Sequence, residues 1–461
     1  MIKACKQNKE SVLQKVRSGK LDSVALSISS IVDEIILSMH TNGILHCLSS
    51  GIQDLRADNT TIPYELVWAS AIAAKMKVRT SLTDIPYAIT DHRTLAELGY
   101  TLIETEQKLG AGLMREGSLR ALLGKYDAQS LFNGYNQVVQ NYILPQLDII
   151  PNIHILDCTD LEVNLRNENY ERSGIATSKR GGTARGYKLS TIRGLTGDTG
   201  LIEDIRFGPL NKHDLSLSEE MLKTSPVLKP GDILINDRGF ISRPILNYLK
   251  NKRKVDTYVP LRKDMDAYKY AVDISQKSSN WFPHPNQNRK NQCITFVPHI
   301  GPCWQSACPS YDVDLNSCVV WDKENNEYFV FATTDTSKSA KDILKIYELR
   351  PEIEEDYRQL KDFWKIEDFK STKLNMIAFH IVCVLFGYLF FQIYTMLPEG
   401  EKLAGKSLPI ALKTYDAKPQ NFVVLYADYE FGVITLLDMM KLYSACGQIV
   451  KEKIEKVMEG I

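Results

Sequence analysis

Helical spacing of apolar residues dominates the first 150 residues. One helix is predicted to begin at Asp22 or Ser23, because apolar residues then recur at every third or fourth position as far as Met39. Further helices are predicted to begin near three other residues, Pro63, Asp91 and Ser118. Residues 1–20 carry six Lys or Arg residues and one acidic residue. A basic helical terminus of this kind suits docking on DNA as well as it suits a solvated amphipathic end.

Short apolar runs of strand type replace this spacing after residue 150. The runs at 154–157 and 232–237 each end in a carboxylate, and residues 263–335 have the pattern of paired strands. We therefore predict an α/β protein with five parts in chain order: a helical N-terminal DNA-binding region at 1–150, the first part of an α/β core at 151–262, a β-rich insertion at 263–335, the second part of the core at 336–397, and a helical region at 398–461. The last region could pair two protomers or dock within one.

Composition and charge narrow the class of protein. Of 461 residues, 44% are hydrophobic and 24% are charged, which is typical of globular domains and excludes a disordered or disulfide-scaffolded chain. The 56 basic and 56 acidic residues cancel, so a uniformly basic surface is excluded but local basic patches are not. The N-terminus lacks the apolar segment of a signal peptide, and with nine cysteines this favours a reducing cytosolic compartment.

Four of the cysteines lie close together in the predicted insertion. Cys293, Cys303, Cys308 and Cys318 are separated by nine, four and nine residues. Four thiolates can hold a structural zinc ion, but the pairs of cysteines two residues apart that mark most zinc sites are missing from this set. We therefore expect free cysteines in a small core, and not zinc.

Three acidic residues are the candidates for chemistry. Asp157 and Asp237 each end an apolar strand, where a carboxylate can lie beside the core and still reach a cleft. Glu354 lies on a predicted helix. Carboxylate oxygens suit Mg²⁺ or Mn²⁺, and two such ions would act on the attacking and leaving oxygens of a phosphoryl displacement. Asp160, three residues after Asp157, is the alternative first acid.

The helix with Glu354 also carries basic and aromatic residues at helical spacing. The set consists of Tyr347, Arg350, Glu354 and Lys361, and its successive members lie three, four and seven residues apart. This spacing places all four side chains on one helical face. Pro351 opposes a continuous helix, because it removes an amide and disfavours helical geometry at Arg350. The helix is therefore expected to kink or restart there.

The chain resembles DDE transposases of the insertion-sequence-four type. Their Tyr–Arg–Glu–Lys signature, with two, three and six intervening residues, is matched by Tyr347, Arg350, Glu354 and Lys361. The block at 237–240 (DRGF) resembles the family's second-acid motif, and residues 155–159 (ILDCT) resemble the first. The resemblance implies an RNase H-like mixed-sheet core, interrupted by the insertion, and cut-and-paste DNA transposition with two Mg²⁺ ions per active site, for which Mn²⁺ may substitute.

The resemblance also implies roles for single residues. Asp157 would bridge both metal ions, Asp237 would complete one site and Glu354 the other. The DNA contacts would come from the three other signature residues, with two more basic residues added from their context, Arg238 in the DRGF block and Lys188 in the basic stretch at 166–193. Trp321 in the insertion would stack on a flipped base of a DNA hairpin intermediate, although packing in a small core explains a tryptophan there equally well.

Partners and location follow from the same resemblance. We expect binding to terminal inverted repeats and to target DNA, a homodimer in the synaptic complex, and a place in the prokaryotic cytoplasm or nucleoid. The alternative is a domesticated or inactive relative that binds DNA without cutting it. Residues 377–397 form an uncharged run of 21 residues, long enough to cross a bilayer. Because the run follows Glu354 so closely, we expect a buried core helix beside the catalytic sheet, and no membrane.

Overall fold

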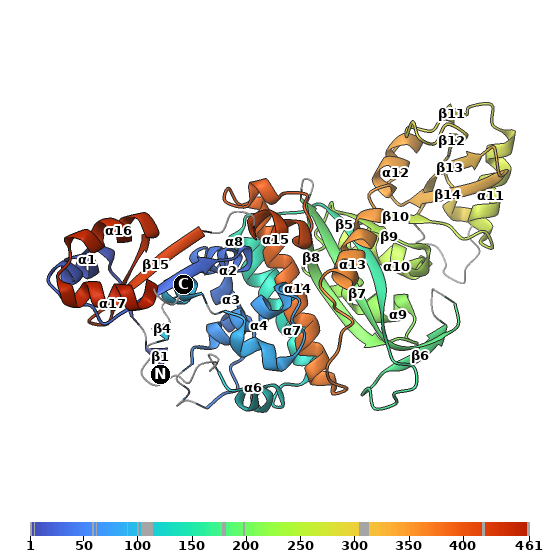
Figure 1. Ribbon diagram of the computed structural model, residues 1–461. Helices are drawn as coiled ribbons and strands as arrows, with labels where there is room; N and C mark the ends of the chain where they lie inside the picture. Colours follow the sequence, from blue (N-terminus) through green and yellow to red (C-terminus); the bar gives the residue numbers. More distant parts are fainter. Residues whose placement is uncertain are drawn as a thin grey trace. The chain divides into compact units, whose positions relative to one another are not determined.

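The structure is a computed structural model of the chain. It describes residues 2–3, 5–57, 60, 62–89, 91–98, 101–102, 114–177, 181–196, 199–303, 313–416 and 420–458. The chain divides into two compact units (Figure 1). Residues 139–359 form one, which we call the sheet unit, and residues 1–138 with 360–461 form the other, which we call the helical unit.

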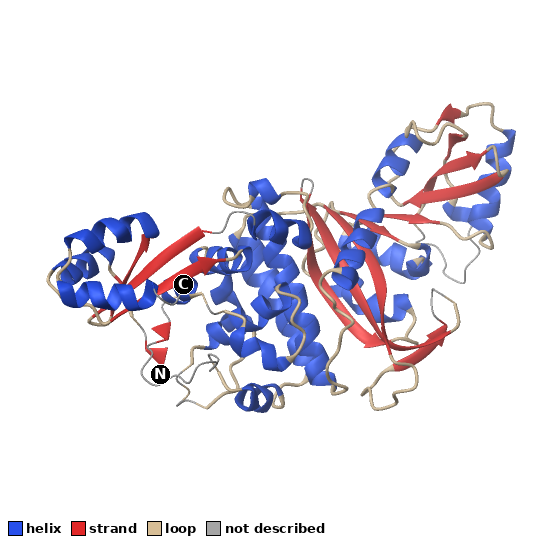
Figure 2. Cartoon of the chain, in the orientation of Figure 1, coloured by secondary structure: helices blue, strands red, loops and turns tan. Residues whose placement is uncertain are grey.

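A ten-stranded mixed sheet organises the sheet unit (Figure 2). At its centre β5 (Ile153–Val163) runs parallel to β9 (Ile233–Asn236), and β9 runs parallel to β10 (Asp256–Pro260). On its other side β5 pairs with antiparallel β7 (Thr183–Thr196). The sheet is therefore mixed, as predicted. The remaining elements here are β6 (Gly174–Thr177), β8 (Thr199–Pro209), α8 (Leu144–Gln146), α9 (Asp214–Thr224) and α10 (Arg243–Tyr248).

Residues 263–335 continue this sheet from its β10 edge. Strand β14 (Glu327–Thr333) pairs with β10, and the order then runs outward through three strands, β13 (Asn316–Asp322), β12 (Gln292–Val297) and β11 (Phe282–Pro283). Helix α11 (Asp266–Lys277) and helix α12 (Ala340–Tyr347) both pack on these strands. The strands predicted for an insertion are therefore hydrogen-bonded to the core sheet, since the β14–β10 ladder joins them.

The predicted long helix after residue 336 is two helices. Helix α12 ends at Tyr347 and helix α13 (Pro351–Asp362) begins at the proline. The restart has the physical cause anticipated for it, because Pro351 has no amide to donate and its ring is tolerated in the first turn of a helix. Residues 348–350 form the turn between the two helices.

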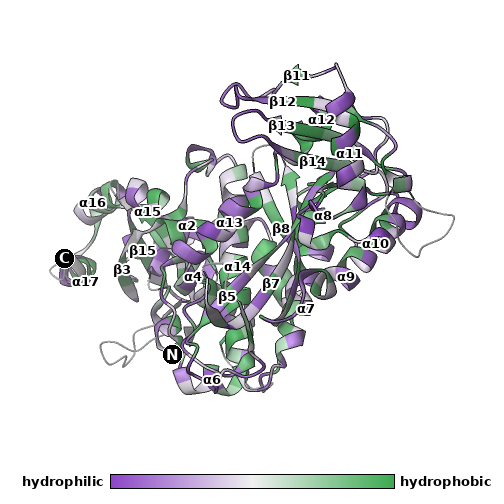
Figure 3. Ribbon diagram, turned by 90° about the vertical axis from the view of Figure 1, so that its right-hand side faces the viewer, coloured by the Kyte–Doolittle hydropathy of each residue, from purple (hydrophilic) through white to green (hydrophobic). Residues whose placement is uncertain are grey.

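The helical unit is built around one long apolar helix, α14 (Leu374–Met396). Its main partners are α2 (Ile31–Thr41), α4 (Tyr64–Met76) and α7 (Ala128–Val138). Most residues of α14 are hydrophobic, and Figure 3 colours the chain by the hydropathy of each residue. Within the described residues it is the one helix long and apolar enough to cross a membrane, and 89% of its most apolar window is buried. The sequence placed this helix beside the catalytic sheet, whereas the structure groups it with helices from residues 1–138.

A small sheet in the same unit lies where the sequence predicted helices, near both ends of the chain. Strand β3 (Ser23–Ser29) lies where the sequence predicted the start of a helix, and β15 (Gln420–Ala427) and β16 (Glu430–Thr435) form a hairpin in the tail predicted to be helical. Asp428 and Tyr429 join the hairpin with positive φ of 50° and 62°, as a two-residue turn with the twist of a hairpin requires. Strand β3 pairs with β15, a partner about 400 residues away that local spacing does not reveal.

The remaining elements of the helical unit surround these two cores. In chain order they are β1 (Ile2–Lys3), β2 (Lys6–Gln7), α1 (Lys9–Arg17), α3 (Ile44–Gly51), α5 (His92–Glu97), β4 (Thr101–Leu102), α6 (Glu116–Leu123), α15 (Leu408–Asp416), α16 (Leu436–Ala445) and α17 (Gln448–Met458). Pro63 precedes α4 and Asp91 caps α5, as predicted. Ser118 lies inside α6 and caps nothing, because that helix begins two residues earlier.

Candidate active site

One arginine gathers the three predicted acids of the sheet unit. The Arg350 guanidinium lies 3.0 Å from a carboxylate oxygen of Asp157, 3.7 Å from one of Asp237 and 2.5 Å from one of Glu354. Asp157 comes from the central strand β5, and Asp237 directly follows β9. Because Leu156 and Asn236 are register partners in these parallel strands, the acids that follow them lie at neighbouring positions. Glu354 comes from the first turn of α13.

Strand geometry favours Asp157 over Asp160 as the first acid. Side chains alternate between the faces of a strand, so residues three apart point to opposite faces. Asp157 lies opposite Thr191 of β7, whereas Asp160 lies opposite Lys188. The face of Asp157 is the one that meets Arg350.

The three carboxylates differ in exposure. Asp157 is 8% exposed, and its Oδ1 accepts a hydrogen bond from the Cys158 amide at 2.8 Å. The side chains of Asp237 and Glu354 are 36% and 55% exposed, so solvent reaches both. Burial disfavours charge on Arg350, but Asp157 and then Asp237 overcome this and hold the pKa of the guanidinium above its usual value. The Arg350 guanidinium is therefore positively charged at neutral pH.

The donor set fits a divalent metal ion in chemistry. All three side chains offer carboxylate oxygens, the hard ligands that Mg²⁺ and Mn²⁺ prefer, and all three already face a single positive group. In the described part of the chain, no three His, Cys, Asp or Glu side chains lie close enough together to hold an ion in common. Between these carboxylates lies the Arg350 guanidinium.

Helix α13 is fastened to the sheet by polar contacts. The Tyr357 hydroxyl donates to the backbone oxygen of Asp157 at 2.7 Å and lies 2.7 Å from the Thr191 hydroxyl. Arg193 of β7 binds two acids of the helix, Asp356 at 2.5 Å and Glu352 at 2.8 Å. These contacts set the rotation of the helix and so aim Glu354 at the other two acids.

Arg193 plays a part that the sequence alone does not reveal. It belongs to the basic stretch at 166–193 considered for DNA, but the residue is 5% exposed and ion-paired inside the unit. Gly200 of β8 leaves room for the guanidinium, since a Cβ there would come within 1.9 Å of it. The strand pattern around Arg193 is the signal that could have revealed its burial. Two other residues of the stretch, Lys179 and Arg180, lie outside the described residues.

The four signature residues do not share one helical face. Tyr347 is the last residue of α12, and its ring lies 4.7 Å from that of Phe331. Arg350 lies in the turn before Pro351, and Lys361 lies in the last turn of α13, 3.1 Å from Glu367. The single-face prediction was wrong because the chain restarts its helix at Pro351. The turn nevertheless carries Arg350 to the carboxylates.

The other residues predicted to contact DNA have different surroundings. Arg238 is exposed, in the short turn directly after Asp237. Lys188 is 13% exposed and paired with Asp214 at 2.5 Å. Trp321 stacks on Tyr328 with ring centroids 6.1 Å apart, and Trp281 lies 5.6 Å away. Its ring is thus packed in an aromatic cluster of the β13–β14 hairpin.

The cysteines of the predicted insertion are only partly described. Cys318 is buried in β13, and burial raises the pKa of its thiol to about 12. Cys293 and Cys303 are half-buried. Cys308 lies outside the described residues, so the set of four is not described as a whole.

Comparison with known proteins adds one match to this geometry. The family model described as Transposase DDE domain matches residues 151–390, more than half of the chain. The match includes Asp157, Asp237, Glu354 and Arg350. No curated protein matches the chain.

Proposed function

The chain belongs to the transposase DDE domain family, and we propose that this transposase is of the insertion-sequence-four type and works by cut-and-paste. The observation that carries the proposal is the meeting of Asp157, Asp237 and Glu354 at one guanidinium, with separations of 3.0, 3.7 and 2.5 Å. The acids come from two adjacent strands and one helix, so the fold, and not a local motif, brings them together.

The three acids would hold the divalent ions that DDE transposases generally use, and we propose Mg²⁺, with Mn²⁺ as a substitute and two ions per site. When bound, such ions activate a water or a 3′-hydroxyl for attack and stabilise the leaving oxygen. Asp157 is the rigid member, because the Cys158 amide fixes one of its oxygens and Tyr357 holds its backbone. Glu354 is the adjustable one, at 55% exposure.

Arg350 would exchange its carboxylate partners for a DNA phosphate. A guanidinium presents a planar pair of donors that suits a phosphate as well as a carboxylate. Its Nε is buried and has no hydrogen-bond partner in the described part of the chain, so a further acceptor would improve its environment. Tyr347, Lys361, Arg238 and Lys188 would contact the DNA around it, Lys188 only after giving up its pair with Asp214.

The later steps of the proposal concern strand joining. The 3′-hydroxyl freed by the first cut would form a DNA hairpin, with Trp321 stacking on a flipped base, and then attack target DNA. Two transposon ends must be held together for this, so a homodimer would form on the terminal inverted repeats. We place the reaction in the prokaryotic cytoplasm or nucleoid, where that DNA is found.

Cleavage of labelled DNA tests the proposal. The substrate is the DNA that flanks the coding sequence, with Mg²⁺, and the variants are Asp157→Asn, Asp237→Asn and Glu354→Gln. Each should lower the cutting rate by at least 10²–10³-fold, roughly, while DNA binding persists.

Two neighbouring acids provide matched controls. Asp160→Asn lies on the opposite face of β5, and Glu355→Gln removes an exposed partner of Arg358 one residue from Glu354. Both should cut at nearly the wild-type rate. A wild-type protein that binds this DNA but never cuts it with Mg²⁺ or Mn²⁺ would refute the proposal in favour of a DNA-binding relative.

A further inference from the structure

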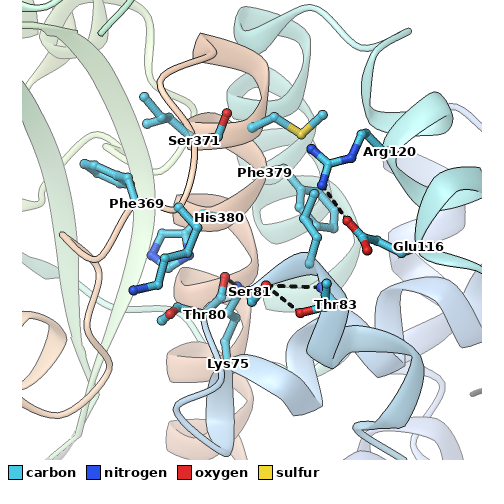
Figure 4. A pocket seen from close by; sticks show the side chains of 14 residues that line it. Lys75, Thr80, Ser81, Thr83, Glu116, Arg120, Phe369, Ser371, Phe379 and His380 are labelled. Carbon is cyan, nitrogen blue, oxygen red and sulfur yellow. Dashed lines mark hydrogen bonds and ion pairs between the residues drawn. The ribbon is translucent and has the colours of Figure 1, made fainter. Parts of the chain in front are cut away.

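A small pocket in the helical unit has no part in the proposed reaction. It is enclosed by the end of α4, the turn at 80–83, helix α6, the segment 369–371 and the start of α14 (Figure 4). Its volume is about 90 Å³, several times the roughly 10–15 Å³ that one water molecule needs. The pocket can therefore hold a ligand of a few heavy atoms, and it joins three stretches that are far apart in the sequence.

A buried ammonium group lies at this pocket. Lys75 is 1% exposed, and its Nζ donates to the backbone oxygens of Thr80 at 2.9 Å and Arg79 at 3.4 Å. These two bonds use two of the three hydrogens of the ammonium. Burial lowers the pKa of Lys75 to about 8, so the group is still mostly charged at neutral pH. An anion in the pocket would compensate this buried charge.

The second buried group at this pocket is the imidazole ring of His380. His380 is 6% exposed, and its Nε2 lies 3.2 Å from the backbone oxygen of Lys365. A carbonyl can only accept, so Nε2 carries the proton. Burial first and Lys75 second lower the pKa of His380 to about 3, so the ring is neutral and Nδ1 bears a lone pair. That Nδ1 is buried and has no hydrogen-bond partner among the residues that the structure describes.

The rest of the lining suits an oxyanion. Two more cations and four hydroxyl groups line the pocket, namely Arg120, Lys370, Thr80, Ser81, Thr83 and Ser371. One carboxylate, Glu116, is among the lining residues, and it is paired with Arg120 at 2.5 Å. Lys370 is paired as well, 2.6 Å from Asp368, and that carboxylate also accepts from the Thr80 hydroxyl at 2.9 Å. Lys75 instead donates to backbone oxygens, and the hydroxyl groups of Ser81, Thr83 and Ser371 can donate to oxygen atoms as well as accept from them.

We propose that this pocket binds a protonated phosphate group, either hydrogen phosphate or the singly protonated form of a phosphomonoester, whose second pKa is about 6, at the end of a nucleotide or DNA strand. Lys75 pairs with the charged oxygens, and the P–OH group donates to Nδ1 of His380. Because this acceptor is buried beside Lys75 and needs a donor, it favours phosphate over sulfate, which has the same shape and carries no proton at neutral pH. The site is independent of the proposed cleavage reaction, because none of its residues belongs to the carboxylate cluster.

Binding to the full-length chain tests the proposal without any measurement of activity. Inorganic phosphate is titrated at constant ionic strength, with sulfate as the control, and the affinity is followed by calorimetry and by the Tm. Phosphate should raise the Tm and bind at least about tenfold more tightly than sulfate. Equal binding of the two ions would overturn the role of His380, and binding of neither would overturn the site.

Two variants locate the binding. His380→Phe removes the acceptor and keeps an aromatic ring, and it should lower phosphate affinity about tenfold while sulfate affinity stays the same. Ser371→Ala removes one half-buried hydroxyl group of the lining and keeps Lys75 and His380, so it should lower phosphate affinity by a smaller factor. Unchanged phosphate affinity in both variants would place the ion elsewhere and refute the proposal.

Competition then identifies the source of the phosphate. A short oligonucleotide with a 5′-phosphate is compared with the same strand ending in a 5′-hydroxyl, each displacing inorganic phosphate. Displacement by the phosphorylated strand alone would identify a DNA end as a ligand. Displacement by neither would restrict the site to the free ion, and equal displacement by both would show that the strand binds elsewhere and would count against a terminal phosphate.

Discussion

The two units each bury a histidine, and the histidine is charged in one unit and neutral in the other. In the sheet unit, His154 is 0% exposed and lies 2.9 Å from Glu203 and 3.2 Å from Asp232. In the helical unit, His380 has one carbonyl partner and a neighbouring lysine. Burial lowers the pKa of both rings. The two carboxylates outweigh it at His154, where the pKa rises to about 9, whereas Lys75 adds to it at His380, where the pKa falls to about 3.

Two helices that follow one another in the chain, α13 and α14, also differ in what holds them in place. Helix α13 is fixed by directional contacts, through Tyr357 and the Arg193 ion pairs. Helix α14, only 11 residues later in the chain, is fixed by apolar packing and buries residues on all its sides. A helix held by polar contacts can present charged side chains at a defined angle, and a helix held by packing provides rigidity without such direction. The predictions below test this difference.

The largest effect is expected where a buried charge loses its partner. Arg193→Leu should lower the free energy of unfolding by about 3–5 kcal/mol, because the carboxylate of Asp356, 4% exposed, loses the opposite charge that Arg193 provides. Denaturant titration measures this. The double variant Arg193→Leu with Asp356→Leu should recover much of the loss. Arg358→Gln, which breaks an exposed pair on the same helix, should cost at most about 1 kcal/mol, and an equal cost for both single variants would contradict the comparison.

Alkaline pH should weaken the sheet unit through His154. The folded pKa of about 9 lies above the ordinary value of 6.5, so the contribution of this group is full below pH 6.5 and is lost as the pH rises through 9. The loss is roughly 3 kcal/mol of unfolding free energy between these limits. Denaturant titrations at pH 6.5 to 9 on wild type and His154→Leu separate the effect, because the variant should be less stable at neutral pH and flatter across the range.

Acidic pH should weaken the helical unit through His380. Here the folded pKa of about 3 lies below 6.5, so the unfolded chain takes up the proton first and stability falls as the pH drops below 6.5. Between pH 6 and pH 4 this single group should remove roughly 2–3 kcal/mol. His380→Phe should lose less stability than wild type over that interval. Identical pH profiles for the two proteins would show that His380 does not titrate as described.

A smaller effect tests the packing of α14. Gly387→Ala would place a methyl group 2.9 Å from the Trp364 ring and 3.3 Å from Met76, so the neighbours must shift, at a cost of about 1–2 kcal/mol. Gly117→Ala on α6 is the matched control, because a Cβ there meets no atom within 4 Å. The control should stabilise the protein by roughly 0.5–1 kcal/mol, since alanine favours a helix over glycine. Thermal unfolding of both variants should therefore show shifts of opposite sign.

Some features follow from short stretches of the chain alone. The composition of 377–397 predicts a long apolar helix, whose burial was expected only because the run follows Glu354 closely. Pro351 predicts a helix restart wherever the segment lies. Asp157 and Asp237 were identified because each ends an apolar strand. Ile353, Tyr357 and Leu360 recur at helical spacing, and all three are buried.

Other features depend on partners that no short stretch contains. Residues 23–29 have apolar spacing compatible with a helix, but the ladder with β15 makes them a strand. Lys188 and Arg193 look alike in the sequence, and only the packing of α9 and α13 gives each its acidic partners. The hairpin in the tail pairs with a strand from the other end of the chain. The tail by itself does not show this partner, and it was therefore expected to be helical.

The sequence by itself determined the family, the three candidate acids with their arginine, and the long apolar helix at 377–397, because each depends on local residue types and spacing. Only the tertiary structure decided that Arg350 lies among all three acids, that Arg193 belongs to the interior, and that His154 is charged while His380 is neutral. The reason is physical. Spacing sets which face a side chain occupies, but the charge state and partner of a buried polar group depend on what the rest of the chain places within about 4 Å of it.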